Sequence, residues 1–107
     1  MILYHGSSEK IIKVDLSRAV PGKDFGRGFY ATNLREQAEL WAKHKTDSEY
    51  LGVVSGFKFN ENNAFNSPFY KTLRFDRYND EWFDFVIANR ANKTYSSSHD
   101  YDIVEGP

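Results

Sequence analysis

The sequence contains no cysteine among its 107 residues. Disulfide bonds are therefore excluded, and so are zinc sites built from thiolates. No apolar run approaches the roughly 20 residues that a membrane-spanning helix needs. The N-terminal residues show neither a basic leader nor a cleavage pattern. From these absences we expect a cytoplasmic location and no membrane partner.

An excess of charge of one sign is lacking as well. The chain carries 14 basic and 15 acidic residues, which gives a formal net charge of -1. Proteins that bind nucleic acid or anionic membranes usually carry a basic excess, so we expect no strong nucleic-acid partner. The length fits one domain with a single core, and we predict one domain over residues 1–107.

Aromatic residues are abundant, at 17% of the chain, and they favour strands and stacking surfaces. Apolar alternation and turn residues predict strands over residues 2–4, 28–32, 51–59, 72–75 and 101–104. Helical spacing predicts two helices, which follow the N-cap residues Asn33 and Asn79 and end near Lys45 and Asn89.

The remaining residues read as loops. One covers residues 9–23 and holds one helical turn, one covers the turn-rich residues 60–68, and one covers the polar residues 91–100. Strands and helices in this order predict an α+β fold whose sheet is not built from regular βαβ units.

His5, Gly6 and Ser7 follow the first predicted strand. A histidine there can hydrogen-bond a ligand hydroxyl, and a glycine lets a ligand reach the backbone. A strand-to-loop turn with a solvated histidine explains the same residues, and the tripeptide alone favours this simpler interpretation.

The stretch DFGRGFYATN, residues 24–33, sets two glycines beside two aromatic residues. Glycine weakens strands, so the stretch is either a bend or a surface that a ligand approaches closely. A phosphate loop is disfavoured, because the stretch lacks the Lys-Ser/Thr ending and the strand-first context of such loops. Tyr30, taken alone, fits a half-buried strand position in a core.

The histidines show no pattern of a metal site. His44 and His99 are isolated in the sequence, and no cluster of Asp, Glu and His has the spacing of metal ligands. We therefore expect no metal. The stretch from Ser96 to Asp100 holds the residue types of a catalytic triad, but triads assemble from distant parts of a chain. We interpret this stretch as a flexible loop.

Four motifs taken together point further. The sequence reads LYHGS, DFGRGFY, EWFDFVIANR and YDIVEGP, in this order. The first two resemble the strand motifs of the ADP-ribosyltransferase superfamily, in the branch typified by poly(ADP-ribose) polymerases and diphtheria toxin. Over nearly its whole length the chain also resembles a bacterial family of small uncharacterised proteins assigned to that superfamily. The resemblance implies a split mixed and antiparallel sheet with two main helices.

The resemblance also implies an NAD-binding cleft, with NAD as the substrate and no metal. His5 would bond a ribose hydroxyl of the adenosine side, the Gly6 backbone would hold the nicotinamide carboxamide with help from Ser7, and Tyr30 would stack on the nicotinamide. Arg27 would lie near the cleft mouth. The residues expected to bind the dinucleotide are His5, Gly6, Ser7, Phe25, Arg27, Gly28 and Tyr30.

Catalysis in the superfamily also uses a glutamate on a later strand, which bonds the ribose. In the resembled bacterial family this strand lies beyond YDIVxGP, so the fold is incomplete here if that strand is required. Glu105 is the candidate within this chain, and the expected catalytic residues are His5, Tyr30 and Glu105.

Three functional classes stay open. The chain is a toxin-like ADP-ribosyltransferase with an unknown acceptor, or a catalytically silent module that binds NAD or ADP-ribose with a partner chain or an antitoxin-like protein, or an interaction domain that uses its aromatic surface.

Overall fold

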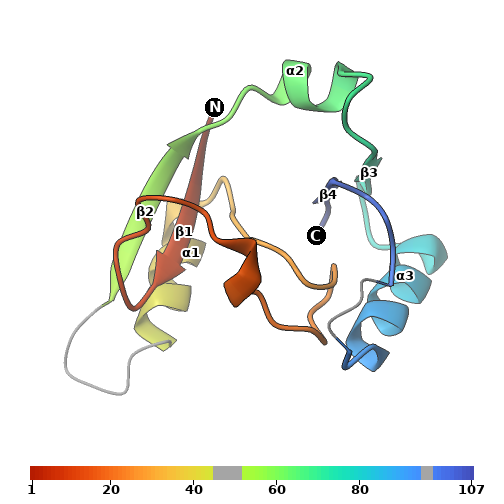
Figure 1. The fold of residues 1–107 in the computed structure, drawn as a ribbon, viewed down its shortest axis with the longest axis horizontal. Coiled ribbons are helices and arrows are strands. Elements are labelled where there is room, and N and C mark those ends of the chain that lie inside the picture. The colour runs from red at the N-terminus through yellow and green to blue at the C-terminus, as the bar shows by residue number, and fades with distance from the viewer. Residues whose placement is uncertain (45–51, 95–97) are drawn as a thin grey trace. The chain divides into compact units, whose positions relative to one another are not determined.

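The computed structural model describes residues 1–44, 52–94 and 98–107. Its elements are β1 (Ile2–Ser7), the 3-10 turn η1 (Leu16–Arg18), α1 (Arg35–His44), β2 (Val53–Lys58), α2 (Glu61–Asn66), β3 (Thr72–Arg74), α3 (Asp80–Ala91) and β4 (Ile103–Glu105). This is an α+β fold, as predicted, with β1 and β2 antiparallel and β3 and β4 parallel (Figure 1).

The chain groups into two compact units. The first unit consists of Met1–Asp15 and Phe29–Glu61, and the second unit consists of Leu16–Gly28 and Asn62–Pro107. The prediction of one domain over residues 1–107 stays a prediction. No helix in the described ranges has the length and apolar content needed to cross a membrane.

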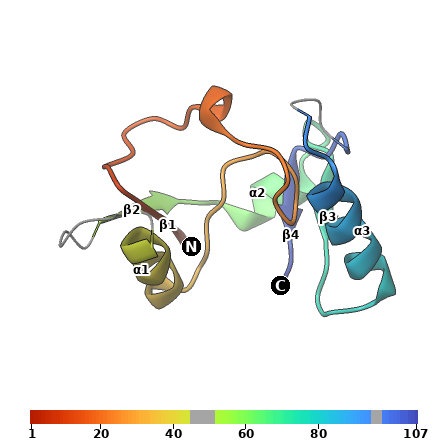
Figure 2. The same cartoon turned by 90° about the horizontal axis from the view of Figure 1, so that it is seen from below.

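The first unit is a two-stranded sheet covered by one helix. β1 and β2 pair so that Leu3 lies opposite Phe57 and His5 opposite Ser55. Figures 1 and 2 both show α1 alongside these strands. Because side chains alternate along a strand, Leu3 and His5 lie on one face of the sheet and Gly6 on the other.

Gly6 is the point where α1 approaches β1 most closely. A Cβ placed on Gly6 would lie 2.0 Å from the Ala38 carbonyl oxygen and 2.6 Å from the Ala42 nitrogen. Ala38 and Ala42 are 0% and 1% exposed, so the smallest side chains of α1 face the strand. Helix and strand backbones meet here because neither carries a side chain that would separate them.

β1 is longer than predicted. His5, Gly6 and Ser7 lie inside the strand, since Ser7 still pairs with Val53. The prediction that the strand ends at His5 was therefore wrong, because the β2 ladder outweighs the weak strand preference of glycine.

The predicted strand over residues 28–32 is also wrong. Within this stretch Thr32 alone pairs, in an isolated antiparallel bridge to Tyr4, with N–O distances of 2.7 and 2.9 Å. Two residues earlier, the Tyr30 carbonyl bonds to the His5 side chain instead of continuing a backbone ladder.

The start of α1 differs by one position from the prediction. The helix begins at Arg35, and the Leu34 carbonyl accepts the first helical hydrogen bonds. The Thr32 hydroxyl accepts a bond from the Leu34 amide at 3.1 Å. Asn33 therefore precedes the cap position that we assigned to it, because Thr32 supplies the side-chain acceptor.

The second unit packs around Phe85 of α3. The ring of Phe85 lies 5.5 Å from Phe75, 6.2 Å from Phe25, 5.1 Å from His99 and 6.3 Å from Tyr101, between centroids. The aromatic content noted in the sequence is thus used largely for packing in this unit.

Helix α3 begins as predicted. The Asn79 side chain accepts a bond from the Trp82 amide at 2.8 Å, which makes Asn79 the N-cap. Asp80 and Glu81 follow in the first turn, where the helix dipole favours acidic side chains.

The connections are described in part. The helical turn predicted within residues 9–23 is present as η1. The loop predicted over residues 60–68 is wrong for its first part, which forms α2 and buries Ala64. Leu51 of a predicted strand, Lys45 of a predicted helix end and residues 95–97 of a predicted loop lie outside the described residues.

Replacing Gly6 with alanine should destabilise the protein. The new Cβ would overlap the Ala38 carbonyl, which belongs to the backbone and cannot rotate away, and overpacking of this kind costs about 1–3 kcal/mol. Gly56→Ala is the matched control on β2, because its Cβ would meet Ile2 at an ordinary 3.6 Å. Urea unfolding should separate the two variants; equal midpoints would contradict the close packing at Gly6.

Candidate functional site

His5 is held on the open face of the first-unit sheet. Its Nδ1 lies 2.5 Å from the Tyr30 carbonyl oxygen. Its ring stacks on Phe29, with 4.3 Å between centroids and 24° between planes. His5 therefore contacts the backbone of Tyr30, which lies 25 residues away in the chain; that the Tyr30 ring lines a groove beside the imidazole stays a prediction.

Phe29 and Tyr30 have different surroundings. The Phe29 ring also meets Phe57 of β2 edge-on, at 5.6 Å and 86°, so Phe29 packs against the sheet. Tyr30 is half-buried, and its carbonyl is the group that contacts His5.

The Gly6 backbone points toward the edge of β1 along which residues 30–32 run. The amide and carbonyl of Tyr4 both bond to Thr32 across that edge. Residues two apart in a strand direct their backbone groups to the same side, so the amide and carbonyl of Gly6 point the same way. Ser7 ends β1 and is half-buried.

Phe25, Arg27 and Gly28 belong to the second unit. The Arg27 guanidinium donates to the carbonyls of Ala19 at 2.8 Å, Leu16 at 3.2 Å and Ser17 at 3.3 Å. It therefore closes the end of η1, where helical carbonyls need donors. Phe25 belongs to the aromatic cluster around Phe85.

Gly26 and Gly28 differ in their packing. Gly26 has a φ of +86°, and a Cβ on it would lie 3.2 Å from the Asn89 side-chain oxygen, so both its conformation and its neighbours favour glycine. For Gly28, no atom of the described residues lies within 4 Å of the Cβ position. Packing within the described chain thus explains the first glycine and not the second.

Glu105, the candidate third catalytic residue, is exposed on β4. Both of its carboxylate oxygens bond to Arg74 Nη2, at 3.2 and 3.0 Å. The Arg74 guanidinium also lies over the Phe65 ring, 4.1 Å from its centroid. Glu105 is thus part of an ion pair that links β4 to β3.

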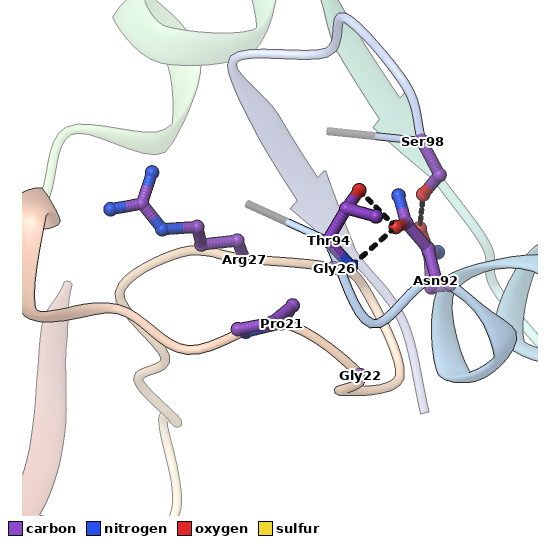
Figure 3. Close-up of a pocket in the computed structure, with 8 residues that line it drawn as sticks. Pro21, Gly22, Gly26, Arg27, Asn92, Thr94 and Ser98 are labelled. Atoms are coloured by element: carbon purple, nitrogen blue, oxygen red, sulfur yellow. Dashed lines mark hydrogen bonds between the residues drawn. The ribbon is translucent and has the colours of Figure 1, made fainter. Parts of the chain in front are cut away.

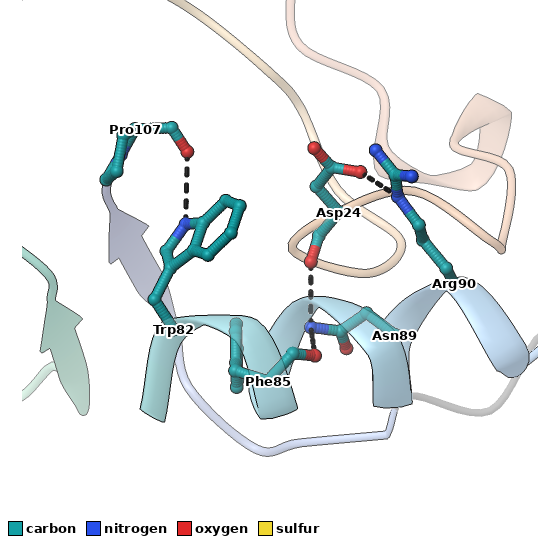
Figure 4. A network of polar contacts seen from close by, with 6 residues as sticks. All are labelled: Asp24, Trp82, Phe85, Asn89, Arg90 and Pro107. Carbon is teal, nitrogen blue, oxygen red and sulfur yellow. Dashed lines mark hydrogen bonds and ion pairs between the residues drawn. The ribbon is translucent and has the colours of Figure 1, made fainter. Parts of the chain in front are cut away.

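A polar network holds the loop around Asp24 on α3, as Figure 4 shows. Asn89 is 1% exposed, and its amide nitrogen donates to the carbonyls of Asp24 at 3.0 Å and Phe85 at 2.9 Å. Its amide oxygen accepts from the Ser98 hydroxyl. Arg90 Nε bonds to the Asp24 carboxylate at 2.5 Å. The DFG and NR residues of two separate motifs therefore bind each other.

His99 is part of the same unit. Its Nε2 lies 2.8 Å from the Phe25 carbonyl, and its Nδ1 accepts from the Tyr101 amide at 3.1 Å. Since a carbonyl can only accept, Nε2 carries the proton. His99 thus tethers residues 99–101 to the Gly26 loop, which differs from the flexible loop that we predicted for that stretch.

A small pocket lies beside this network. Figure 3 shows it between the loop of Pro21, Gly22, Gly26 and Arg27 and the residues Asn92, Thr94 and Ser98. It holds about 170 Å³ of empty space, part of it open to solvent. Because that figure includes open solvent, the enclosed space is far below the about 300–1,000 Å³ of ligand pockets, and this pocket is too small for a dinucleotide.

Ion pairing in the second unit raises the pKa values of basic side chains and lowers the pKa of an acidic one. The hydrogen bond to Asp24 raises the pKa of Arg90. The bond from Lys71 lowers the pKa of Asp100, and Asp100 raises the pKa of Lys71. The Asp100 contribution to stability is present above its unfolded pKa and is lost as the pH falls through its lower folded pKa. Solvent screening keeps such contributions small.

No group of three or more His, Asp or Glu side chains within the described ranges could hold a metal ion. Sequence reasoning missed the roles of Asp24, Asn89, Arg90 and His99, because they depend on contacts between distant residues. The available signal was the recurrence of polar residues within two otherwise aromatic motifs, DFGRGFY and EWFDFVIANR.

Asn89→Asp should destabilise the second unit. The substitution keeps the shape but replaces an amide donor with a carboxylate that faces two carbonyl oxygens, which costs about 3 kcal/mol or more. The matched control is Asn79→Asp at the other end of α3, where the side chain only accepts and a negative charge suits the helix dipole. Urea unfolding should show a loss for Asn89→Asp alone; equal changes would contradict the network.

The comparisons with known proteins gave a family and no characterised relative. A family model described as a protein of unknown function (DUF3990) matches residues 1–107. No curated protein and no solved structure matches the chain. Since the family match covers the whole sequence, the chain belongs to the DUF3990 family.

Proposed function

We propose that this protein is a bacterial, cytoplasmic NAD-binding protein of the ADP-ribosyltransferase type, which transfers ADP-ribose from NAD to an acceptor and releases nicotinamide. The single observation that carries the proposal is the contact of His5 with Phe29 and Tyr30. It brings His5 of the LYHGS motif into contact with Phe29 and Tyr30 of the GRGFY motif, and these are the two motifs that resemble the superfamily.

The residues around His5 have the chemistry that a dinucleotide needs. An imidazole can bond a ribose hydroxyl. The resemblance assigns the nicotinamide carboxamide to the Gly6 backbone, whose amide and carbonyl are directed to the edge of β1 where Tyr4 bonds to Thr32. A half-buried tyrosine offers a ring face for the nicotinamide.

The reaction itself places demands on the site. Breaking the bond between ribose and nicotinamide develops positive charge at the sugar, as in glycoside cleavage. A protein accelerates this step by holding the two groups in a fixed pose and by placing negative charge or dipoles near the sugar. Glu105 is the carboxylate that we assign to this task. The chemistry of the site does not identify the acceptor of the ADP-ribose or an antitoxin-like partner.

One observation favours a second candidate, a module that binds NAD or ADP-ribose without turnover. The Glu105 carboxylate is paired with Arg74 through both oxygens. A carboxylate neutralised by a guanidinium stabilises a developing cation less than an unpaired one does.

Titration calorimetry with NAD and with ADP-ribose tests the proposal. Tyr30→Ala should weaken NAD binding by about 5- to 150-fold, because stacking of a ring on a tyrosine contributes about 1–3 kcal/mol, and should affect ADP-ribose much less. Tyr4→Phe on β1 is the control. Equal losses for both ligands would remove Tyr30 from the nicotinamide site, and absence of NAD binding by the native protein would end the proposal.

Nicotinamide release, followed by chromatography, separates the two candidates. If the protein is an enzyme that uses Glu105, Glu105→Gln should lower release by at least about 100-fold while NAD binding stays. Arg74→Gln is the control, because it keeps the carboxylate and should not lower release. Native protein that binds NAD without releasing nicotinamide supports the silent module, and full release by Glu105→Gln removes Glu105 from the mechanism.

A further inference from the structure

We propose that Phe29 is a positioning residue for His5: its ring, with the Tyr30 carbonyl, holds the imidazole as the Nδ1–H tautomer, so that Nε2 acts as the acceptor for a ligand hydroxyl. The inference deepens the proposed function and rests on it for the identity of the ligand. The assignment of the tautomer rests on contacts within the first unit alone.

The tautomer follows from the hydrogen bond. The Tyr30 carbonyl oxygen has lone pairs and no proton, so at 2.5 Å the proton must lie on His5 Nδ1. In a neutral imidazole the second nitrogen is then an acceptor. A ribose hydroxyl, which can donate, matches an acceptor nitrogen.

The ring plane follows from Phe29. Phe29 stacks on the imidazole at 4.3 Å, and Phe57 of β2 meets the Phe29 ring edge-on at 5.6 Å. Phe57 lies on the same face of the sheet as His5, opposite Leu3. Phe29 is thus itself fixed by the sheet, and it limits rotation of the imidazole about its Cβ–Cγ bond.

Adjacency in the chain strengthens this arrangement. Phe29 and Tyr30 are consecutive, so one short segment supplies both the stacking ring and the carbonyl. This segment lies outside any strand and is tied to β1 by the bridge of Thr32 to Tyr4. A loss of the Phe29 ring would therefore loosen the geometry of the Nδ1 bond as well.

The tautomer also predicts which dinucleotide is favoured. NAD carries hydroxyl groups at the 2′ and 3′ positions of its adenosine ribose, whereas NADP carries at the 2′ position a phosphate, which accepts and does not donate. An acceptor nitrogen facing that phosphate would lose its hydrogen bond and meet a like partial charge. We expect NAD to bind at least about tenfold more tightly than NADP.

Long-range ¹H–¹⁵N NMR correlations of the histidine rings test the positioning directly, without any ligand. The native protein should show His5 as the Nδ1–H tautomer at neutral pH. His99 supplies an internal reference of the opposite kind, because its Nε2 donates to Phe25 and its Nδ1 accepts from Tyr101. His5→Gln and His44→Gln assign the signals.

Phe29→Leu should shift His5 toward a mixture of tautomers and weaken NAD binding about two- to tenfold. Phe29→Tyr keeps the stacking ring and should restore both. Phe59→Leu, an equivalent change elsewhere in the first unit, should leave the His5 tautomer unchanged. If Phe29→Leu fails to fold, the tautomer in native protein and in Phe29→Tyr still decides the assignment.

The outcomes distinguish the inference from the proposed function. An Nε2–H or doubly protonated His5 in the native protein, or an unchanged His5 in folded Phe29→Leu, would overturn the inference whatever the protein binds. Equal affinities for NAD and NADP would overturn the acceptor role of Nε2. A native protein with the Nδ1–H tautomer that binds no dinucleotide would overturn the proposed function and leave the positioning of His5 by Phe29 supported.

Discussion

The hydrogen bond from the His5 imidazole to the Tyr30 carbonyl is the interaction on which the candidate site depends. It joins a regular strand to a segment outside any strand, and because a carbonyl can only accept, it requires a proton on Nδ1. Phe29 adds a stacking contact on the same imidazole. A side-chain hydrogen bond adds only about 1 kcal/mol to the net free energy of folding. The main effect of this bond is therefore to fix the orientation of the imidazole.

The two glycines of the GRGFY stretch differ in how far packing explains them. Gly26 is required by its positive φ and by the nearby Asn89 side chain, and Asn89 in turn holds the Asp24 carbonyl. Gly28 has no positive φ, and no atom of the described residues lies within 4 Å of its Cβ position. Glycine in an ordered segment costs chain entropy, and packing among the described residues does not explain this cost at Gly28.

The sequence predicted those parts of the fold that depend on local patterns. Alternation in VVSGFK predicted β2, and the Asn79 side chain predicted the start of α3. The predictions failed where distant partners decide. The His5 bond spans 25 residues and the Asn89 bond to Asp24 spans 65, so local patterns could not show that residues 28–31 form no strand, or which partners the polar residues of the two motifs bind. The prediction of a loop where α2 lies was wrong, because the residues ENN at its start are common both at helix starts and in loops.

The ion pair of Glu105 with Arg74 bears on turnover more than on binding. Exposed pairs contribute little to stability, so a stronger partner can displace Arg74 from the carboxylate at low cost. In the proposed reaction, a developing sugar cation would have to take the Glu105 carboxylate from Arg74, whose guanidinium lies over the Phe65 ring. Turnover through Glu105 would therefore require that Arg74 release its partner.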